Sequence, residues 1–365
     1  MKINTIKEKL LRAVLLCERI AGKKESLPVL SCILIDAVKG ISLRATNLEA
    51  GIEIHIPGEV KEKGVIAVPA TILSQTIRSI TGDTVALSSE EENLLVESRG
   101  TKTLIKAIPH SEFPAIPVSS TKKVISLPRE SLMRGIQGVS YAASLSMIRP
   151  DLGSIYVTMK NGSIVFVATD SFRLAEKTVL EPGMKEGHDI LVPLRHGNEI
   201  THLLERVEDE RVGLSTDEAQ LVLSSEGLHY VSRVVDATFP NYKEIVPKRF
   251  STEATVLKND LVEMLRKARV FSGNDQHVGF HIYPKKKICT AIARSNDVGE
   301  MSDSLDAALS GDDLDINFHI GYLAECLSSI ESDSVVLSFA GPGKPLVIRG
   351  VSDQSFLYLV MPLNR

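Results

Sequence analysis

Four short patterns in the sequence contain residue types that elsewhere bind phosphate, bind metal or attack a substrate. The first, Gly341-Pro342-Gly343-Lys344-Pro345, combines glycines with a lysine as a phosphate-binding loop does. Such a loop needs the spacing G-x-x-x-x-G-K-[ST], in which backbone amides surround the phosphates and the hydroxyl group holds magnesium. Here the glycines stand too close together, and proline occupies the hydroxyl position. The pattern therefore predicts a hairpin turn.

A serine and a lysine, Ser119 and Lys122, have the S-x-x-K spacing found in penicillin-binding enzymes. The S-D-N and K-T-G motifs that complete such a site do not occur in the chain. We interpret the polar stretch Ser119-Ser120-Thr121 as part of a linker between domains.

Two further pairs of residues are candidates for a catalytic or metal site. His277 and His281 are four residues apart, which is the spacing of two metal ligands on one helix face. The residues between them favour a strand, and no cysteine or carboxylate pattern completes the ligand set. Asp170 and Arg173 could be an acid and a cation in a cleft, but we interpret Asp170 as a turn residue that accepts backbone hydrogen bonds. We therefore expect no catalytic residue, metal or cofactor.

The elements that would position such residues recur three times along the chain. Ala45-Thr46-Asn47 and Ala168-Thr169-Asp170 are 123 residues apart (45 to 168), and Asn296 follows Asp170 by 126 residues (170 to 296). This period is too long for a solenoid and matches a whole domain. The apolar run at 164–167 predicts a buried strand that ends in a tight turn into the next strand.

Each repeat is expected to begin with an amphipathic helix, with Thr5, Pro128 and Asn259 as the start signals. Second helices are expected at 70–80, 194–206 and 321–330, each followed by two alternating strands. The apolar faces of the first helices are formed by Ile6, Leu10, Ala13, Val14, Cys17 and Ile20, by Leu132, Ile136, Val139 and Ala143, and by Leu261, Leu265 and Ala268.

These elements predict an α+β fold with three copies of one domain, each containing two helices packed on antiparallel sheets. The expected domains are 1–119, 120–248 and 249–365, and 365 residues give room for three. A hydrophobic content of 43% and a charged content of 24% are ordinary for a globular protein. We expect a cytosolic chain without a signal peptide or membrane span, in which four widely spaced cysteines stay reduced. These are Cys17, Cys32, Cys289 and Cys326.

The distribution of charge says more than the net charge of −4. Acidic runs such as 90–92 and 208–210 fall in loops, whereas basic residues gather on the first helices. Basic helices with acidic loops suit a body that is negative outside and positive on one inner surface. The alternative is that these cations are merely solvated. They are Lys7, Lys9 and Arg12, then Arg129 and Arg134, then Lys258, Arg266, Lys267 and Arg269.

The carboxyl-terminal sequence FLYLVMPLNR is unusually hydrophobic. A methionine followed by proline at 361–362 ends a strand and leaves a flexible side chain beside a rigid turn. If this tail lies near Leu174 and Pro240, it forms an apolar groove for a short peptide, with Arg173 as the polar marker. The alternative is that the tail fills an interface between domains.

A series of short motifs is specific when its order, its spacing and the threefold repeat are taken together. The motifs are Leu27-Pro28-Val29-Leu30, Ala45-Thr46-Asn47-Leu48-Glu49, Phe113-Pro114, Ala168-Thr169-Asp170 with Arg173-Leu174-Ala175, Phe239-Pro240-Asn241-Tyr242 and Val360-Met361-Pro362. By these motifs the chain resembles, along its whole length, the family of beta sliding clamps of bacterial DNA polymerase III.

The resemblance implies a non-catalytic processivity factor. Two chains would form a head-to-tail homodimeric ring, with twelve helices lining a hole for duplex DNA. The basic residues of these helices would face the DNA and meet its phosphates without reading sequence. A separate ATP-driven clamp loader would open the ring, which would tether the polymerase catalytic subunit at high effective concentration. Other polymerases and repair proteins would bind through a Gln-Leu-x-Leu-Phe-type motif. The protein would work in the cytoplasm at the nucleoid.

The resemblance also implies residue roles. Leu174, Ile245, Val360 and Leu363 would form the apolar pocket for the motif, and Met361 would be a movable gate. The dimer seam matches Thr103, Ile105, Val270 and Phe271, and a DNA contact at the rim matches Lys24. The full groove set is Leu152, Thr169, Arg173, Leu174, Pro240, Ile245, Val360, Met361, Pro362 and Leu363.

The chain departs from the family pattern at Ser171, Phe172 and Glu244 near the groove and at Thr103 in the seam. These departures leave partner preference and dimer strength open. Two other functions therefore stay under consideration. One is a peptide-binding hub that does not encircle DNA, and the other is an enzyme that uses Asp170, Arg173 or the two histidines His277 and His281.

Overall fold

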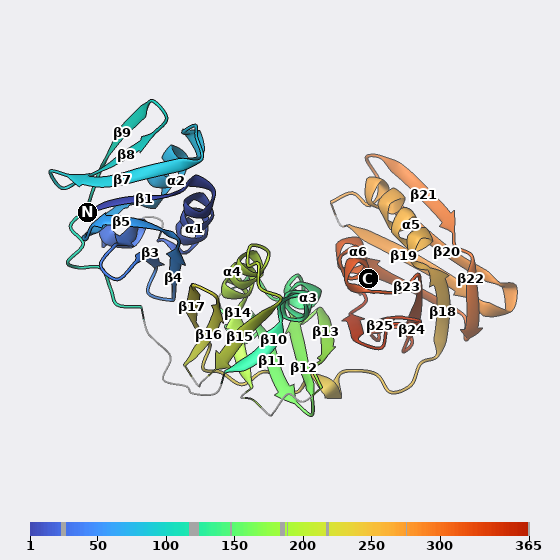
Figure 1. Cartoon of the computed structure of the whole chain (residues 1–365). Coiled ribbons are helices and arrows are strands. Elements are labelled where there is room, and N and C mark those ends of the chain that lie inside the picture. The colour runs from blue at the N-terminus through green and yellow to red at the C-terminus, as the bar shows by residue number, and fades with distance from the viewer. Residues whose placement is uncertain are drawn as a thin grey trace. The chain divides into compact units, whose positions relative to one another are not determined.

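The computed structural model describes residues 1–22, 27–116, 124–146, 148–182, 187, 189–216, 219–274 and 276–363 (Figure 1). By its internal contacts the chain divides into two compact units, Met1–Met133 with Asn198–Val234 and Arg134–Gly197 with Val235–Arg365. Each unit is described by itself. The expected boundary at 119, with Ser119, Ser120, Thr121 and Lys122, lies outside the described residues.

The first unit contains two antiparallel sheets. The five-stranded sheet has the order β5 (Gly58–Glu62), β1 (Lys2–Ile6), β7 (Thr84–Glu90), β8 (Asn93–Ser98) and β9 (Thr101–Lys106). Helices α1 (Lys7–Ile20) and α2 (Ala70–Ser79) pack against each other, and α1 also packs on β3 and β4 (Figure 1). The eight-stranded sheet has the order β10 (Ile125–Pro128), β15 (Arg211–Thr216), β16 (Gln220–Ser225), β17 (Leu228–Arg233), β4 (Ala50–Ile56), β3 (Ile41–Thr46), β2 (Cys32–Asp36) and β6 (Val65–Pro69).

The second unit also contains two antiparallel sheets. Its four-stranded sheet has the order β21 (Gly299–Ser304), β20 (Ile288–Ser295), β19 (His277–Tyr283) and β23 (Leu314–His319). Helices α5 (Lys258–Phe271) and α6 (Ile320–Cys326) pack against each other, and α5 also packs on β20 and β21. The nine-stranded sheet has the order β14 (Ile190–Pro193), β11 (Ser154–Lys160), β12 (Ser163–Thr169), β13 (Arg173–Leu180), β26 (Phe356–Val360), β25 (Leu346–Gly350), β24 (Ser334–Phe339), β18 (Thr252–Leu257) and β22 (Ala307–Gly311).

The middle third of the chain divides its strands between these two units. Its strand β17 pairs with β4 of the first repeat, and its strand β13 pairs with β26 of the third. We call the β4–β17 pair the first seam and the β13–β26 pair the second seam. Each seam continues a hydrogen-bonded ladder from one repeat into the next, which is why the division by contacts cuts through the central repeat. Helices α3 (Arg129–Ser140) and α4 (Leu194–Leu204) both cross this division point.

The predicted helices and strands are confirmed, except that the helix expected at 321–330 ends as an α-helix at Cys326 and continues as a short 3-10 helix. Of the three predicted start signals, Pro128 directly precedes α3, but Thr5 and Asn259 are wrong. Thr5 lies in β1, where its hydroxyl group donates to Pro57 O, and Asn259 is the second residue of α5. The N-cap residues of α1 and α5 are Ile6 and Leu257, which make no side-chain cap. Each helix instead continues directly from a paired strand, so no loop is left in which a capping side chain could turn back. Ile6 accordingly lies half exposed in the strand and not on the apolar face of the helix.

The remaining local predictions are confirmed. Gly341 to Pro345 form the hairpin turn between β24 and β25, in which Lys344 N–H donates to Gly341 O at 3.1 Å. His277 and His281 lie on strand β19, where they are not aligned as on a helix face. All four cysteines are free and buried. Three short 3-10 helices, η1 (Pro28–Ser31), η2 (Tyr242–Glu244) and η4 (Leu327–Ser329), lie in connections, and η3 (Pro284–Lys286) joins β19 to β20.

Candidate functional site

The turn between β12 and β13 is fixed by its own side chains. Asp170 Oδ1 accepts hydrogen bonds from the N–H groups of Phe172 and Arg173, both at 3.0 Å. The Thr169 hydroxyl group donates to Arg173 O at 2.6 Å and accepts from Ser171 N–H at 3.2 Å. Ser171 has φ = 80°, a left-handed conformation that non-glycine residues rarely adopt. The prediction that Asp170 is a turn residue is therefore confirmed.

Arg173 is the most densely bonded side chain near this turn. Its Nε lies 2.9 Å from Asp170 Oδ2, and its two other nitrogens bind the Glu325 carboxylate and Tyr141 O. The guanidinium carbon lies 4.3 Å from the centre of the Tyr322 ring. Burial acts to lower the pKa of Arg173, but the bond to Glu325 and the nearby negative charges raise it above its ordinary value. The arginine is therefore a fixed cation that holds the turn to helix α6.

The carboxyl-terminal tail is held to the same turn by its backbone. Arg173 is paired with Val360 across the second seam, and the next tail residue, Met361, donates its N–H to Phe172 O at 2.8 Å. Leu363 N–H donates to Asn317 O on β23, also at 2.8 Å. The tail as far as Leu363 is thus anchored on both sides, to the turn and to β23.

The expected groove residues separate into buried and exposed groups. Leu174 and Val360 are completely buried, and Leu152 and Thr169 nearly so, so a peptide could reach little of their side chains. The accessible apolar side chains are Ile245 (54% exposed), Met361 (36%) and Leu363 (38%). Pro240 is exposed and Pro362 is half-buried. Phe172, which belongs to the expected departures, is 61% exposed and adds a ring to this surface.

An aromatic cluster holds the segment after Phe239 onto the sheet. Tyr242 packs in a core cluster with Leu174 and Leu359, and its hydroxyl group donates to the Glu176 carboxylate. The Phe239 ring stacks on the Tyr156 ring at 5.0 Å between centroids. Burial, followed by the bond to Glu176, raises the pKa of Tyr242 well above its ordinary value. These contacts position Pro240 and Ile245 on a rigid base.

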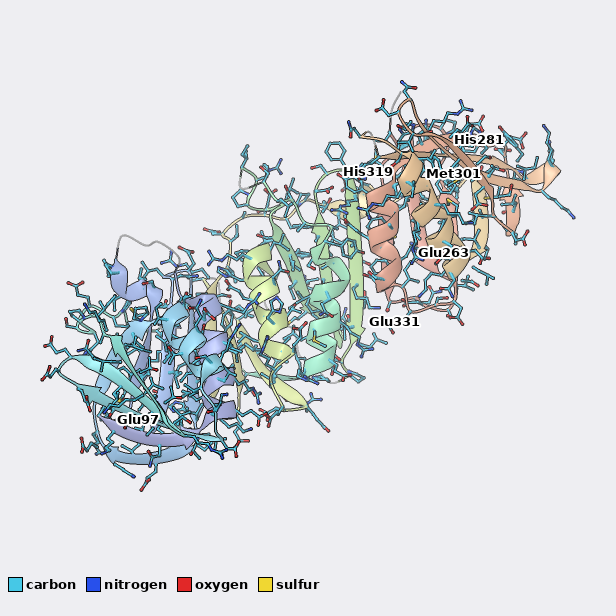
Figure 2. The ribbon with its side chains drawn as sticks, turned by 90° about the horizontal axis from the view of Figure 1, so that it is seen from above. Glu97, Glu263, His281, Met301, His319 and Glu331 are labelled. Carbon is cyan, nitrogen blue, oxygen red and sulfur yellow. The ribbon has the colours of Figure 1, made fainter. Side chains whose placement is uncertain are left out.

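Next to the second seam lies a buried cluster of charges. Lys177 Nζ on β13 lies 3.7 Å from Asp353 Oδ2 and 3.5 Å from Glu331 Oε1. The side chains of Lys177 and Asp353 are 6% and 7% exposed. Asp353 also accepts hydrogen bonds from Glu331 N–H and from Ser355. In Figure 2, His319, which directly precedes α6, and Glu331, which follows η4, lie at opposite ends of the α6–η4 segment.

The first seam repeats the backbone arrangement of the second. Asn47 Oδ1 accepts from Glu49 N–H at 3.0 Å and from Ala50 N–H at 2.7 Å, and Leu48 has φ = 72°. Arg233 N–H donates to Glu49 O at 2.9 Å, as Met361 N–H does to Phe172 O. The side chains differ, because Ala50 stands in the position of Arg173 and Glu49 in that of Phe172 (offset 123).

The predicted DNA-facing cations make two kinds of contact. Lys9 and Arg12 form exposed ion pairs with Glu208, and Arg134, Arg266 and Lys267 form exposed pairs with Glu331, Glu263 and Asp303. Arg269 is exposed and forms no ion pair with any residue in the described ranges. Lys7, Arg129 and Lys258 bind backbone carbonyl groups instead. Lys24 lies outside the described residues.

The predicted dimer-seam residues lie in different settings. Thr103 and Ile105 lie on β9, an edge strand of the five-stranded sheet, and Ile105 points into the core. Val270 is 63% exposed and Phe271 is half-buried at the end of α5. Among the described residues β9 pairs only with β8, so its other backbone edge is a surface that another strand can extend.

Sequence reasoning missed Tyr141, Tyr322 and Glu325, the partners of Arg173. Glu325 is 152 positions from Arg173, and no local pattern connects them. Among the residues that the structure describes, no group of three His, Cys, Asp or Glu side chains could hold a metal ion. No helix in those same ranges is long and apolar enough to cross a membrane.

Comparison with known families gives three consecutive matches. The DNA polymerase III beta subunit N-terminal domain matches residues 1–117, the central domain 126–241 and the C-terminal domain 243–364. Relatives named "Beta sliding clamp" include those of Synechococcus elongatus, 24% identical over 100% of this chain and 99% of the relative. That of Bacillus subtilis is 23% identical over the full length of both chains.

Solved structures with the same fold cover the whole chain. The DNA polymerase III beta subunit of Thermotoga maritima has a TM-score of 0.94 at 24% identity, covering 100% of this chain and 99% of that one. The Bacillus subtilis DNA polymerase sliding clamp has a TM-score of 0.94 at 21% identity with the same coverage. The predicted α+β fold of three repeated domains is confirmed by these likenesses and by the repeated element order. With all three domain families matched in order, the chain belongs to the DNA polymerase III beta subunit family, the beta sliding clamps.

Proposed function

We propose that this protein is a non-catalytic sliding clamp, which encircles duplex DNA and tethers the replicative polymerase during DNA replication. The observation that carries the proposal is the ordered match of all three clamp domains over the whole chain. A closed ring confers processivity because it cannot leave circular DNA, so the polymerase bound to it stays at high local concentration. Such a protein acts on the DNA of the cytoplasm.

The test of this function is topological. The clamp is assembled by a cognate ATP-dependent clamp loader on nicked circular DNA and separated from free protein by gel filtration. We expect it to elute with the circles and to dissociate when a restriction enzyme linearises them. Retention on linear DNA with free ends would contradict encirclement and would favour direct binding instead.

Contact with DNA is assigned to the exposed cations of the first helices. Lys9, Arg12, Arg134, Arg266 and Lys267 form ion pairs with carboxylates that are partly or fully exposed, and such pairs contribute little to stability. Phosphates of a nucleic acid can therefore replace these carboxylates at a small free-energy cost. Contacts of this kind carry no sequence information, so they permit sliding.

The ring requires a second copy of the chain. We infer that the β9 edge of one copy, with Thr103, meets the region of Val270 and Phe271 in the other. Support comes from the unpaired strand edge and the exposed Val270 side chain. Sedimentation equilibrium at micromolar concentration is expected to give a dimer. A stable monomer there would favour the alternative of a peptide-binding hub that does not close around DNA.

Polymerases, the clamp loader and repair proteins are proposed to bind the surface formed by Phe172, Ile245, Met361 and Leu363 through a Gln-Leu-x-Leu-Phe-type segment. The exposed apolar side chains beside a rigid turn and the fixed cation Arg173 support this assignment. A fluorescent Gln-Leu-Ser-Leu-Phe peptide is expected to bind saturably, as read by polarization. The double variant Met361→Ala/Leu363→Ala should lose this binding.

The first seam offers a matched control for that experiment. Leu48 occupies the same left-handed turn position as Ser171 and is 57% exposed. Leu48→Ala should leave peptide binding unchanged. Equal losses in Leu48→Ala and in the tail variant would place the peptide elsewhere or indicate general unfolding.

A further inference from the structure

The first helix of every repeat begins with a basic residue. Lys7, Arg129 and Lys258 are the first residues of α1, α3 and α5. A cation at this position is unfavourable within its own helix, because the amino-terminal end carries partial positive charge. A contact outside the helix is needed to explain why the same choice occurs three times.

All three side chains bind carbonyl groups at or just after the carboxyl end of the second helix in their own repeat, which in the third repeat continues from α6 into η4. Lys7 Nζ lies 2.5 Å from Ile80 O, and Lys258 Nζ lies 2.8 Å from Ile330 O. Arg129 Nη1 lies 3.0 Å from Leu204 O and 3.2 Å from Val207 O. The last carbonyl groups of a helix have no partner within the helix and carry partial negative charge. The cation is unfavourable at the amino-terminal end of the first helix, but its contact with the carbonyl groups at the end of the second helix is favourable.

The backbone N–H groups of the same three residues also bind carbonyl groups that follow the second helix. Lys7 N–H donates to Asp83 O, and Arg129 and Lys258 donate to Glu210 O and Asp333 O, each at 2.8 Å. In every repeat this acceptor stands three residues after the carbonyl group that the cation binds: 80 and 83, 207 and 210, 330 and 333. The next residue begins a strand that pairs with the strand before the first helix, as Ile6 pairs with Thr84.

The groups that these cations bind differ from the partners of Arg134, Arg266 and Lys267 on the same kind of helix. The carbonyl groups that they bind belong to Ile80, Val207 and Ile330, whose side chains are all buried. By contrast, Arg134, Arg266 and Lys267 are exposed and paired only with surface carboxylates. A carbonyl group beside a buried side chain is less open to a replacement hydrogen bond from water than a surface carboxylate is.

We propose that Lys7, Arg129 and Lys258 are positioning residues, repeated in all three domains, that fix the start of the first helix against the end of the second. They are therefore removed from the DNA-contacting set, and their role is to hold the helices that present the remaining cations. The DNA part of this inference rests on the proposed function, whereas the helix-locking part does not.

The test compares each positioning cation with an exposed cation on the same helix. The full-length variants are Lys7→Met, Arg129→Met and Lys258→Met, with Lys9→Met, Arg134→Met and Arg266→Met as matched controls. Urea unfolding gives the midpoint of each variant. Binding to a fluorescent primed duplex over a salt series gives the slope of log K against log salt, which reports the number of phosphate contacts.

We expect the three positioning variants to unfold at lower urea concentration, with a salt slope within error of the parent. The controls should keep the parental midpoint and reduce the magnitude of the slope by roughly one each. The conservative changes Lys7→Arg, Arg129→Lys and Lys258→Arg should restore the midpoint, because either cation can bind a carbonyl group.

Two results would overturn the proposal. Positioning variants with parental midpoints would show that the contacts do not lock the helices. A reduced salt slope in the same variants, with a normal midpoint, would return the three cations to the DNA surface. If the parent itself fails to bind DNA, the proposed function fails, and the urea midpoints with their conservative rescues still decide the helix-locking role.

Discussion

The two seams have the same backbone and opposite side-chain chemistry. In both, an Asx turn with a left-handed residue leads into a strand that pairs with a strand from the next repeat. At the first seam the turn and the end of the partner strand carry Glu49 and Arg233, which form an exposed pair at 3.7 Å. At the second seam the same positions carry Phe172 and Met361. One backbone arrangement has thus produced a charged surface and an apolar one.

The two seams differ in whether their ion pairs are exposed or buried. The first seam region places ion pairs at the surface, including Lys9 and Arg12 with Glu208, where solvent and salt screen them. The second seam buries Lys177 with Asp353 and Arg173 with Asp170, which leaves its surface free for apolar side chains. The apolar surface for partners is therefore expected at the second seam alone.

The largest expected effect comes from breaking the buried pair. Lys177→Met leaves the Asp353 carboxylate buried without its cation, and removing one partner of such a pair typically costs about 3–5 kcal/mol. Arg233→Met, which breaks the exposed pair with Glu49 at the first seam, should cost less than about 1 kcal/mol. Urea unfolding of both variants measures the comparison. Equal losses would show that burial does not distinguish the two seams.

The second effect concerns peptide binding and is tested by exchanging the corresponding residues of the two seams. Phe172→Glu gives the second seam the residue of the first, and it should weaken binding of the Gln-Leu-Ser-Leu-Phe peptide roughly tenfold or more. Burial of a phenylalanine side chain contributes about 1.5–3 kcal/mol, and 1.4 kcal/mol is a factor of ten. The reverse change Glu49→Phe should create no second site, since the apolar tail is missing there. Two bound peptides per chain in Glu49→Phe would contradict this reasoning.

The third effect is a dependence on acid. Burial acts to raise the pKa of Asp353, but hydrogen bonds from Ser355, from backbone amides and the charge of Lys177 lower it below its ordinary value. A lowered folded pKa gives stability that is present above the unfolded value, about 3.9, and is lost as pH falls through the folded value. The advantage of the parent over Asp353→Asn should therefore be constant from pH 7 to 5 and shrink below about pH 4. Urea midpoints at pH 6, 4 and 3 check this, and an advantage that grows in acid would refute it.

The smallest effect concerns the surface pairs of the first seam region. Glu208→Gln removes the partner of Lys9 and Arg12 and should lower the urea midpoint slightly in low salt. At 1 M salt the Debye length is about 3 Å, so parent and variant should unfold together. The Lys177→Met deficit should persist at that salt concentration. A Glu208→Gln deficit that survives high salt would mean that this pair is shielded from solvent.

Much of the fold was predictable because it depends on neighbours in sequence. Helical spacing identified Leu10, Ala13 and Val14 as a buried face, and the residue types at Asp170 and Gly341 identified turns. The helix starts were mispredicted at Thr5 and Asn259 because they depend on segments that are distant in the sequence. Strand pairing with distant segments continued into the helix and replaced the side-chain cap that those residues would otherwise supply.

The candidate site was only partly predictable. The motif around Arg173 and the apolar tail were visible as local patterns, yet nothing near them indicated that Tyr322 and Glu325 hold the arginine. Nor did the sequence separate Leu174 and Val360, which are buried, from Met361 and Leu363, which reach the surface. Accessibility depends on what packs above a residue, and that is set by other segments.

The sequence by itself determined the threefold repeat, the element types and the turn chemistry, because each depends on residues within a few positions of one another. Only the tertiary structure decided that two lysines on one helix make different contacts. Lys7 and Lys9 differ by two positions, which turns their side chains to different sides of α1. One meets the end of a neighbouring helix and the other meets solvent and Glu208, and only three-dimensional packing supplies those surroundings.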